Sequence, residues 1–544
     1  MLDWLSSIGK KADHPMYNVA EAQKLLRDLP ADPGKALEEI SSWLETVTAA
    51  EGYAPDDRIG VVKLLDETGQ EYEPIVLEEF LRKAGLKEHD RLKLWQALVG
   101  FWEHLSSAYH LCLQEIAQAT KPGGAPHPER ALLVMRALRA LANEGKMLHL
   151  RYLPVKPRIW QELAELYSQA EKEQTLSEVV KAYATDLLPT NARQEFLRSF
   201  MMDAAIPESN QTLEVELSAR VIARHASGFI IHAKPEEGCN FCFDLARPDR
   251  PVRRSPEAPA SATLRYFGVG RSGAEIQEII NRHTVNPEEP EKRFGDDFSI
   301  QEKLVVLKRL LLYWGESPPK RRGPRVKIDA KLKVSRGFSA AAELVTRVEL
   351  SGMAEMTEDQ RMRVKQQTGI ALQAQEATAV VTEWVERDGS TWGIGVDIPR
   401  QDEPWAKIGT LCVFQAPGHK SWWVGAIRRM YRDQQERAHA GIEIVSKKPL
   451  SVYLRGIGEG AQRTDNWASS SGSFEFTYVN ALILGESATS GTRQEILVAR
   501  DIFKPGIQYE VMMGEQTPQV RLEELLERGE DYDRVRVTWL KPAA

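Results

Sequence analysis

Three arginines in one short loop are the residues of this chain best suited to bind an anion. The segment 320–325 reads K-R-R-G-P-R and supplies Arg321, Arg322 and Arg325, of which the first and last form an R-x-x-x-R pair. A guanidinium is planar and presents paired N–H donors, so it binds phosphate through two parallel, charge-assisted hydrogen bonds. The glycine and proline between the arginines permit close approach and stiffen the loop, which reduces the entropy lost on binding. This loop therefore predicts a site for a compact anion.

A second group of polar residues follows about sixty residues later. The segment 388–393 reads D-G-S-T-W-G, which has the form D-x-S-x-x-G. The carboxylate of Asp388 accepts hydrogen bonds from N–H donors, and the hydroxyl of Ser390 both donates and accepts. Gly393 leaves room for a ligand or a neighbouring backbone to approach closely. Each segment alone is common by chance, so the prediction of one shared site depends on both.

Both segments adjoin stretches with the periodicity of β-strands. Residues 326–334 alternate between apolar and charged or polar side chains, and residues 393–398 follow directly from the second segment. Further strands are predicted at 379–385, 411–414, 422–430 and 441–445. Short strands separated by turn residues favour a small antiparallel β-barrel, with each segment at the start of a strand. A helical pattern at 356–373 interrupts the series.

The order of these features resembles that of PilZ domains, the bacterial receptors for the second messenger cyclic di-GMP. The resemblance covers about residues 318–455 and includes the G-I-E-I-V sequence at 441–445, which is similar to a strand near the end of such domains. Residue by residue, it assigns to ligand binding Arg321, Arg325, Asp388, Ser390 and Gly393, with Arg322 as a further candidate. The separation of the two motifs is longer than is usual in the family, and some members bind no nucleotide.

The resemblance also implies a ligand chemistry. Cyclic di-GMP carries two phosphodiesters and two guanines, and a guanidinium binds either the phosphates or the O6/N7 edge of guanine. Asp388 would accept from the N1–H and N2–H₂ donors of guanine, and Ser390 would add a hydroxyl contact. The implied protein is a receptor rather than an enzyme, with no cofactor and no metal. The ligand would bind as one molecule or as an intercalated dimer.

Charge and cysteine content limit the other classes of function. A net charge of −7 argues against a protein that coats nucleic acid or an acidic membrane. The four cysteines are too few for a disulfide framework, and the C-x-x-C pair Cys239 and Cys242 lacks a second pair, although His232 is available as a third metal ligand. Residues 1–11 lack the apolar core of a signal peptide, and no apolar run is long enough to span a bilayer. We therefore expect a cytoplasmic protein.

The first half of the chain predicts helices. Apolar residues recur at helical spacing from about residue 19 to 210, and the segment 160–167 resembles one tetratricopeptide helix without a clear second copy. Between 212 and 317 the pattern becomes mixed. The G-x-G-x-x-G at 268–273 is not followed by the second strand that a dinucleotide site requires, so we interpret it as a strand-to-helix turn.

We therefore predict a multidomain α+β protein with four regions. These are an α-helical interaction domain at 1–211, a mixed α/β region at 212–317, a PilZ-like antiparallel β-barrel at 318–455 and a small β-rich domain at 456–544. The expected function is a cyclic di-GMP receptor that signals to a protein partner in pilus, flagellar or exopolysaccharide machinery. The alternative is a ligand-free scaffold or chaperone-like adaptor. No enzyme motif stands out.

Overall fold

The computed structural model divides the chain into two compact units, Met1–Lys320 and Arg321–Ala544. It describes residues 12–120, 125–186, 188–255, 257, 261–320, 322–352, 379–457, 478–485, 493–512 and 518–540. The division lies one residue after Pro318 and Pro319, two residues that restrict the backbone and cannot continue a helix. The structure is the multidomain α+β arrangement that the sequence predicts, with helices first and sheets after them.

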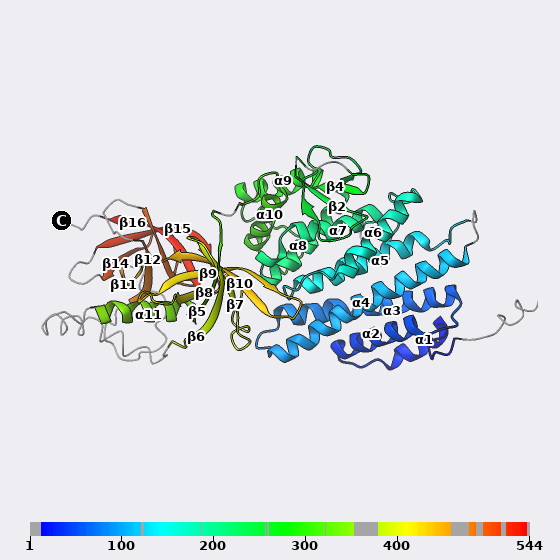
Figure 1. Cartoon of the computed structure of the whole chain (residues 1–544), viewed down its shortest axis with the longest axis horizontal. Coiled ribbons are helices and arrows are strands. Elements are labelled where there is room, and N and C mark those ends of the chain that lie inside the picture. Colours follow the sequence, from blue (N-terminus) through cyan, green and yellow to red (C-terminus); the bar gives the residue numbers. More distant parts are fainter. Residues whose placement is uncertain are drawn as a thin grey trace, which may run out of the picture. The chain divides into compact units, whose positions relative to one another are not determined.

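Within the described residues, the first unit begins with the helices α1 to α8, of which α2 to α5 lie side by side (Figure 1). Their bounds are α1 Val19–Leu25, α2 Pro33–Ala49, α3 Pro55–Arg82, α4 Glu88–Ala119, α5 Arg130–His149, α6 Pro157–Lys172, α7 Ala192–Ala204 and α8 Thr212–His225. The apolar stripe of α4 packs inward, so Trp102 and Tyr109 are buried. In α6, Trp160 stacks on Phe200 of α7 with ring centroids 5.8 Å apart. These aromatic residues therefore form part of the core.

A small sheet and two helices complete the first unit. The sheet has the order β1-β4-β2-β3, and α9 and α10 follow it. The bounds are β1 Ile230–His232, β2 Phe241–Asp244, β3 Val252–Arg253, β4 Leu264–Gly268, α9 Arg271–Val285 and α10 Ile300–Trp314. One hydrophobic core runs from the helices into this part, and Trp314 donates a hydrogen bond to the carbonyl of Met201 at 3.0 Å.

The G-x-G-x-x-G sequence forms the turn between β4 and α9, and its glycines are needed for packing. A Cβ on Gly268 would lie 1.9 Å from the carbonyl oxygen of Gly238. Gly270 has φ +50°, and a Cβ there would lie 2.3 Å from the carbonyl oxygen of Gly228. The protein's own backbone thus occupies the space that these glycines leave open, and the motif is explained without a nucleotide.

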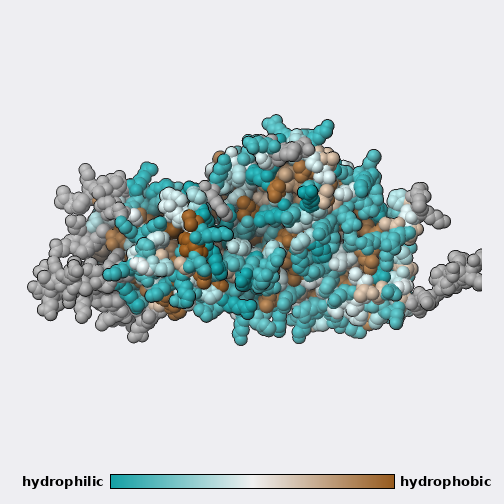
Figure 2. All heavy atoms as spheres, viewed as in Figure 1, coloured by the Kyte–Doolittle hydropathy of each residue, from teal (hydrophilic) through white to brown (hydrophobic). Residues whose placement is uncertain are grey.

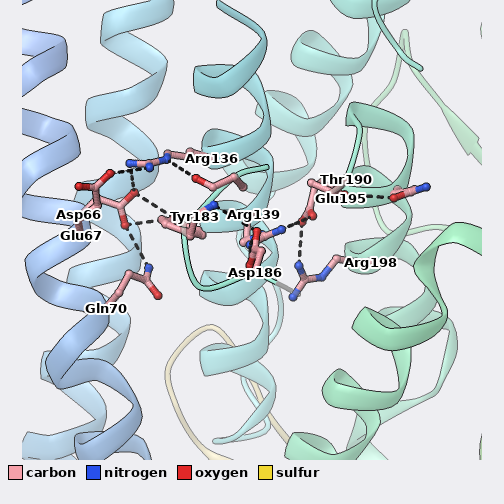
Figure 3. A network of polar contacts seen from close by, with 12 residues as sticks. Asp66, Glu67, Gln70, Arg136, Arg139, Tyr183, Asp186, Thr190, Glu195 and Arg198 are labelled. Atoms are coloured by element: carbon pink, nitrogen blue, oxygen red, sulfur yellow. Dashed lines mark hydrogen bonds and ion pairs between the residues drawn. The ribbon is translucent and has the colours of Figure 1, made fainter. Parts of the chain in front are cut away.

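A network of buried charges fastens the loop between α6 and α7 onto α3, α4 and α5 (Figure 3). At its centre Asp66, which is fully buried, accepts hydrogen bonds from Tyr109 at 2.5 Å, Tyr183 at 3.0 Å and Arg136 at 3.3 Å. Arg136 also donates to the carbonyl of Ala182 at 2.9 Å, so a helix and the loop share one guanidinium. Burial raises the pKa of Asp66, while Arg136 and Tyr109 lower it.

Glu195 forms the second centre of this network. Its carboxylate accepts from Arg139 at 2.8 Å and from Arg198 at 2.9 Å. Burial alone would raise the pKa of Glu195, but the two arginines outweigh it and bring the pKa from 4.5 to about 2. An acid whose pKa is lower in the folded state than in the unfolded state stabilises the fold at pH values above the unfolded pKa. This contribution is lost as the pH falls through the folded pKa.

Glu195→Gln should therefore destabilise the first unit by about 3 kcal/mol at pH 7. The difference from wild type should shrink as the pH falls from about 5 toward 3, because the unfolded carboxylate becomes protonated first. Urea unfolding at several pH values measures this difference. Glu178→Gln removes an exposed carboxylate and is the control, which should leave the free energy of unfolding unchanged at every pH. If the difference in unfolding free energy between wild type and Glu195→Gln did not change with pH, the lowered pKa of Glu195 would be contradicted.

The second unit contains two closed six-stranded antiparallel barrels. The strands of the first barrel are β5 Val326–Arg336, β6 Thr382–Gly389, β7 Gly393–Asp397, β8 Leu411–Gln415, β9 Trp423–Arg432 and β10 Ala438–Ser446. Those of the second are β11 Pro449–Ile457, β12 Tyr478–Leu484, β13 Arg493–Ala499, β14 Gln508–Met512, β15 Gln519–Arg528 and β16 Tyr532–Leu540. Alternating burial along β10 and β16 matches the period of two in their sequences.

The two barrels have the same strand connectivity. Their orders around the barrel are β10-β7-β6-β5-β8-β9 and β11-β12-β13-β16-β15-β14. When the strands of each are counted from one to six, both have the pairs 1-2, 2-3, 3-6, 6-5, 5-4 and 4-1. The β-rich end of the chain is therefore a second copy of the topology that carries the two motifs. It is closed, so its described strands leave no unpaired sheet edge.

Helix α11, Gly337–Gly352, directly follows β5 and was not predicted from the sequence. Gly337 has φ +88°, and the carboxylate of Asp531 accepts the backbone N–H of Phe338 at 2.6 Å, which caps the start of the helix. Apolar residues of α11 pack with β8 and β9 of the first barrel and with β12, β13 and β16 of the second. The helical pattern predicted at 356–373 lies outside the described residues.

The visible surface is mainly hydrophilic, with hydrophobic groups exposed in scattered areas (Figure 2). Within the part of the chain that the structure describes, no helix combines the length and apolar character needed to cross a bilayer.

Candidate functional site

Arg325 and Asp388 meet at one end of the first barrel. The guanidinium of Arg325 donates a hydrogen bond to the Asp388 carboxylate and forms an ion pair with it. The contact follows from strand pairing, since Lys327 of β5 lies opposite Asp388 of β6 and places the arginine loop beside the second motif. The two motifs predicted from sequence are thus brought together by adjacent strands, with Arg325 and Asp388 as their point of contact.

Two glycines of β7 form the floor beneath this ion pair. A Cβ on Gly395 would lie 2.7 Å from the Asp388 carboxylate and 3.0 Å from the Arg325 guanidinium. A Cβ on Gly393 would lie 2.8 Å from the carbonyl oxygen of Ile442 and 3.7 Å from the guanidinium. Any side chain at Gly395 would displace the pair, so glycine there keeps the pair close to the barrel wall. Gly395 was not among the predicted site residues, although it follows Gly393 by two residues and thus shares its face of the strand.

Ser390 organises the turn between β6 and β7. Its backbone N–H and its hydroxyl both donate to the carbonyl of Gly393, at 2.8 and 3.1 Å. The same hydroxyl accepts from the backbone N–H groups of Trp392 and Gly393, at 3.3 and 3.2 Å. The serine and glycine of the D-x-S-x-x-G motif therefore contact one another and fix the turn that carries Asp388. Ser390 thus shapes this turn through its own hydrogen bonds.

Arg322 contacts the same turn through Trp392. Its guanidinium stacks over the indole of Trp392 at 5.5 Å from the ring centroid, and Trp392 is 52% exposed. An arginine on an exposed aromatic ring gives a planar, cationic surface suited to a purine or a phosphate. Arg321 lies outside the described residues. Of the three predicted arginines, two are described, and both are at the β6–β7 turn.

An arginine of the first barrel connects the surroundings of this site to the second barrel. Arg428 of β9 donates to Glu443 at 2.8 Å and to Glu527 of β15 at 2.7 Å. Glu443 is paired in the ladder with Gly393. Glu443, which lies beside Gly393, is therefore connected to the second barrel through Arg428.

The second barrel does not repeat the motifs. The connection between its second and third strands, 486–492, lies outside the described residues, but its sequence E-S-A-T-S-G-T contains no aspartate. The residues before its first strand, Lys447 and Lys448, include no arginine. The sequence of the second barrel thus lacks the arginines and the aspartate that the two motifs supply at the equivalent positions of the first barrel.

The C-x-x-C pair lies within the first unit. Cys239 is buried and Cys242 is half-buried, and burial raises the pKa of each thiol. His232 is next to Glu236 at 3.2 Å. Among the described residues, no group of three or more His, Cys, Asp or Glu side chains is arranged to hold a metal ion.

The first unit matches a known protein family. Residues 20–236 match the family model described as "Cyclic-di-GMP receptor FimW, N-terminal domain". The matched segment runs from α1 to just beyond β1 and covers less than half of the chain. No curated protein matches this chain. The helical unit is therefore similar to the N-terminal domain of a cyclic di-GMP receptor family.

Proposed function

We propose that this chain is a cyclic di-GMP receptor that binds the dinucleotide on its first barrel, as in PilZ domains. The observation that carries the proposal is the Arg325–Asp388 pair, held over Gly393 and Gly395 where the two motifs meet. The name of the matching family supports the ligand class independently of the motifs, because that match ends at residue 236. The missing motifs in the second barrel support the choice of the first.

The arrangement presents donor and acceptor groups side by side. The Arg325 guanidinium offers N–H donors to phosphate or to the O6/N7 edge of guanine, and Asp388 accepts from the N1–H and N2–H₂ groups. Their contact holds both side chains in place before binding, which lowers the ordering cost of the complex. Arg321 and Arg322 supply further cations, and Ser390 and Gly393 hold the turn that carries Asp388.

The response is transmitted to a protein partner. We assign the partner-binding role to the helical unit, and pilus, flagellar or exopolysaccharide machinery are the candidate destinations. Ligand binding shifts the population of conformations only if the ligand has different affinities for them, so the partner must distinguish the liganded barrel. The protein acts in the cytoplasm as a receptor and catalyses no reaction.

Calorimetric titration of the full chain with cyclic di-GMP tests this function. We expect saturable heat and an increase in melting temperature at ligand concentrations on the order of tens of micromolar or below. The Arg321→Ala/Arg325→Ala double variant should lose both effects and keep its fold. Absence of heat and of any thermal shift with wild type would leave the ligand-free adaptor, which instead predicts full partner binding by the double variant.

A further inference from the structure

The face of the barrel next to the motifs continues across two more strands. Asp388 of β6 is paired with Gly395 of β7, Gly395 with Gly441 of β10, and Gly441 with Arg429 of β9. Directly paired residues point to the same face of a sheet, and neighbouring strands are about 4.8 Å apart. The row from Asp388 to Arg429 thus spans roughly 14 Å, with two glycines in its middle. It forms a shallow shelf with the motif at one end.

Arg429 lies at the other end of this shelf, half-buried on the outward face of β9. Its neighbours are engaged by the protein's own carboxylates, Arg428 by Glu443 and Glu527, and Arg432 by Glu403. Within the described parts of the chain, Arg429 itself has neither an ion-pair nor a hydrogen-bond partner. Its guanidinium is therefore available for paired acceptor atoms of a ligand.

Tyr431 provides a ring beside this arginine. It lies two residues further along β9, on the same face, and is 52% exposed. One side of its ring stacks on His439 with centroids 4.6 Å apart and planes 15° from parallel. His439 is held in turn by Asp397 at 2.8 Å and Asp433 at 3.3 Å. These contacts support the ring from below and leave its outer part accessible.

Charges near Tyr431 are mostly balanced. Asp397 pairs with Arg387 and His439, and Asp433 pairs with Arg437 at 2.7 Å. Burial, Asp397 and Asp388 raise the pKa of Tyr431, so its hydroxyl stays protonated at neutral pH. A neutral ring next to an unpaired guanidinium has the composition that binds a nucleobase, through stacking on the ring and two hydrogen bonds from the arginine.

Resting on the proposed function, the geometry points to Arg429 and Tyr431 as additional ligand-binding residues outside both motifs. One guanine of the dinucleotide stacks on Tyr431, and the Arg429 guanidinium binds a pair of acceptor atoms on the ligand. Gly441 carries no side chain, so the surface between this end and the Arg325–Asp388 pair, which lies over Gly395, is low enough for the ring of the dinucleotide. The site thus extends onto β9 and β10, beyond the strands β5, β6 and β7 at which the motifs lie.

Calorimetry of the full-length variants with cyclic di-GMP tests this assignment. Arg429→Ala should weaken binding roughly 5- to 100-fold, and Arg429→Lys should recover only part of it, because an ammonium cannot make two parallel hydrogen bonds. Tyr431→Leu should weaken binding about tenfold, whereas Tyr431→Phe keeps the stacking surface and should bind like wild type. Arg400→Ala, at an exposed position elsewhere on this barrel, is the control and should have no effect.

The outcomes separate this inference from the proposed function. If wild type binds and Arg429→Ala, Tyr431→Leu and the control all bind equally well, the additional contacts are wrong while the receptor function stands. Equal losses in Tyr431→Phe and Tyr431→Leu would contradict stacking, and full recovery in Arg429→Lys would contradict the two-point contact. If wild type does not bind, the proposed function itself fails. All of these positions are on the surface, so thermal melting should show an intact fold in each variant.

Discussion

Arg325→Ala should weaken cyclic di-GMP binding roughly 10- to 100-fold, because it removes the guanidinium that we propose makes charge-assisted contacts to the ligand. It also leaves the Asp388 carboxylate without its cation, and this carboxylate would then repel a nearby phosphate. The side chains of Arg325 and Asp388 are 28% and 36% exposed, so their ion pair contributes little to stability and the melting temperature should not change. Isothermal titration calorimetry and thermal melting of the same samples measure both effects.

Two further variants show whether Arg325 acts together with Asp388. Asp388→Ala should also weaken binding, and the double variant should lose less than the two single losses added together, since the side chains are in direct contact. Arg400→Ala, which removes an exposed arginine from the same barrel, should bind like wild type. A shared site would be contradicted if the losses in binding free energy of the two single variants added up to the loss of the double variant. Unchanged affinity of Arg325→Ala would also contradict it.

Asp66→Ala should destabilise the helical unit by about 3–5 kcal/mol, which lowers its melting temperature by roughly 5 °C. The substitution removes the common acceptor of Tyr109, Tyr183 and Arg136 and leaves three buried donors without this partner. Unsatisfied buried donors and an uncompensated buried charge are among the largest sources of instability in a core. Thermal melting followed by circular dichroism, which reports mainly on the helices, measures the effect.

The same helix offers a matched control for this variant. Glu71→Ala removes an exposed carboxylate from α3 and should change stability by less than about 0.5 kcal/mol. Replacing both members of the buried pair, Asp66→Leu with Arg136→Met, should recover part of the loss, because no buried charge then lacks a partner. A melting temperature within about 1 °C of wild type for Asp66→Ala would show that the network is dispensable.

The strands that carry the two motifs could be anticipated because their signals are local. Alternation along residues 326–334 and the D-x-S-x-x-G turn depend on side chains a few residues apart, and β5, β6 and β7 lie where these patterns occur. The G-x-G-x-x-G sequence could also be interpreted from nearby residues as a strand-to-helix turn, because the residues after it do not form the second strand of a dinucleotide site. The predicted division into four regions and the predicted binding residues remain predictions, although Arg325 and Asp388 are in contact.

The remaining features depend on residues far apart in the sequence. The start of α11 is capped by Asp531, nearly two hundred residues later, so no local signal marked it. The identical connectivity of the second barrel arises from pairing between strands, which alternating residues do not specify. The row that joins Asp388 to Arg429 requires the register of four strands. Sequence periodicity indicates which face of a strand is outward, but not which strands are neighbours.

A crystal structure of the full chain bound to cyclic di-GMP would show whether the ligand lies on the first barrel. We expect ligand density over Gly393 and Gly395, with Arg325 contacting a phosphate or a guanine edge and a second base reaching Tyr431. Density in the helical unit with an empty barrel would contradict it, and would assign the ligand to the segment that matches the receptor family.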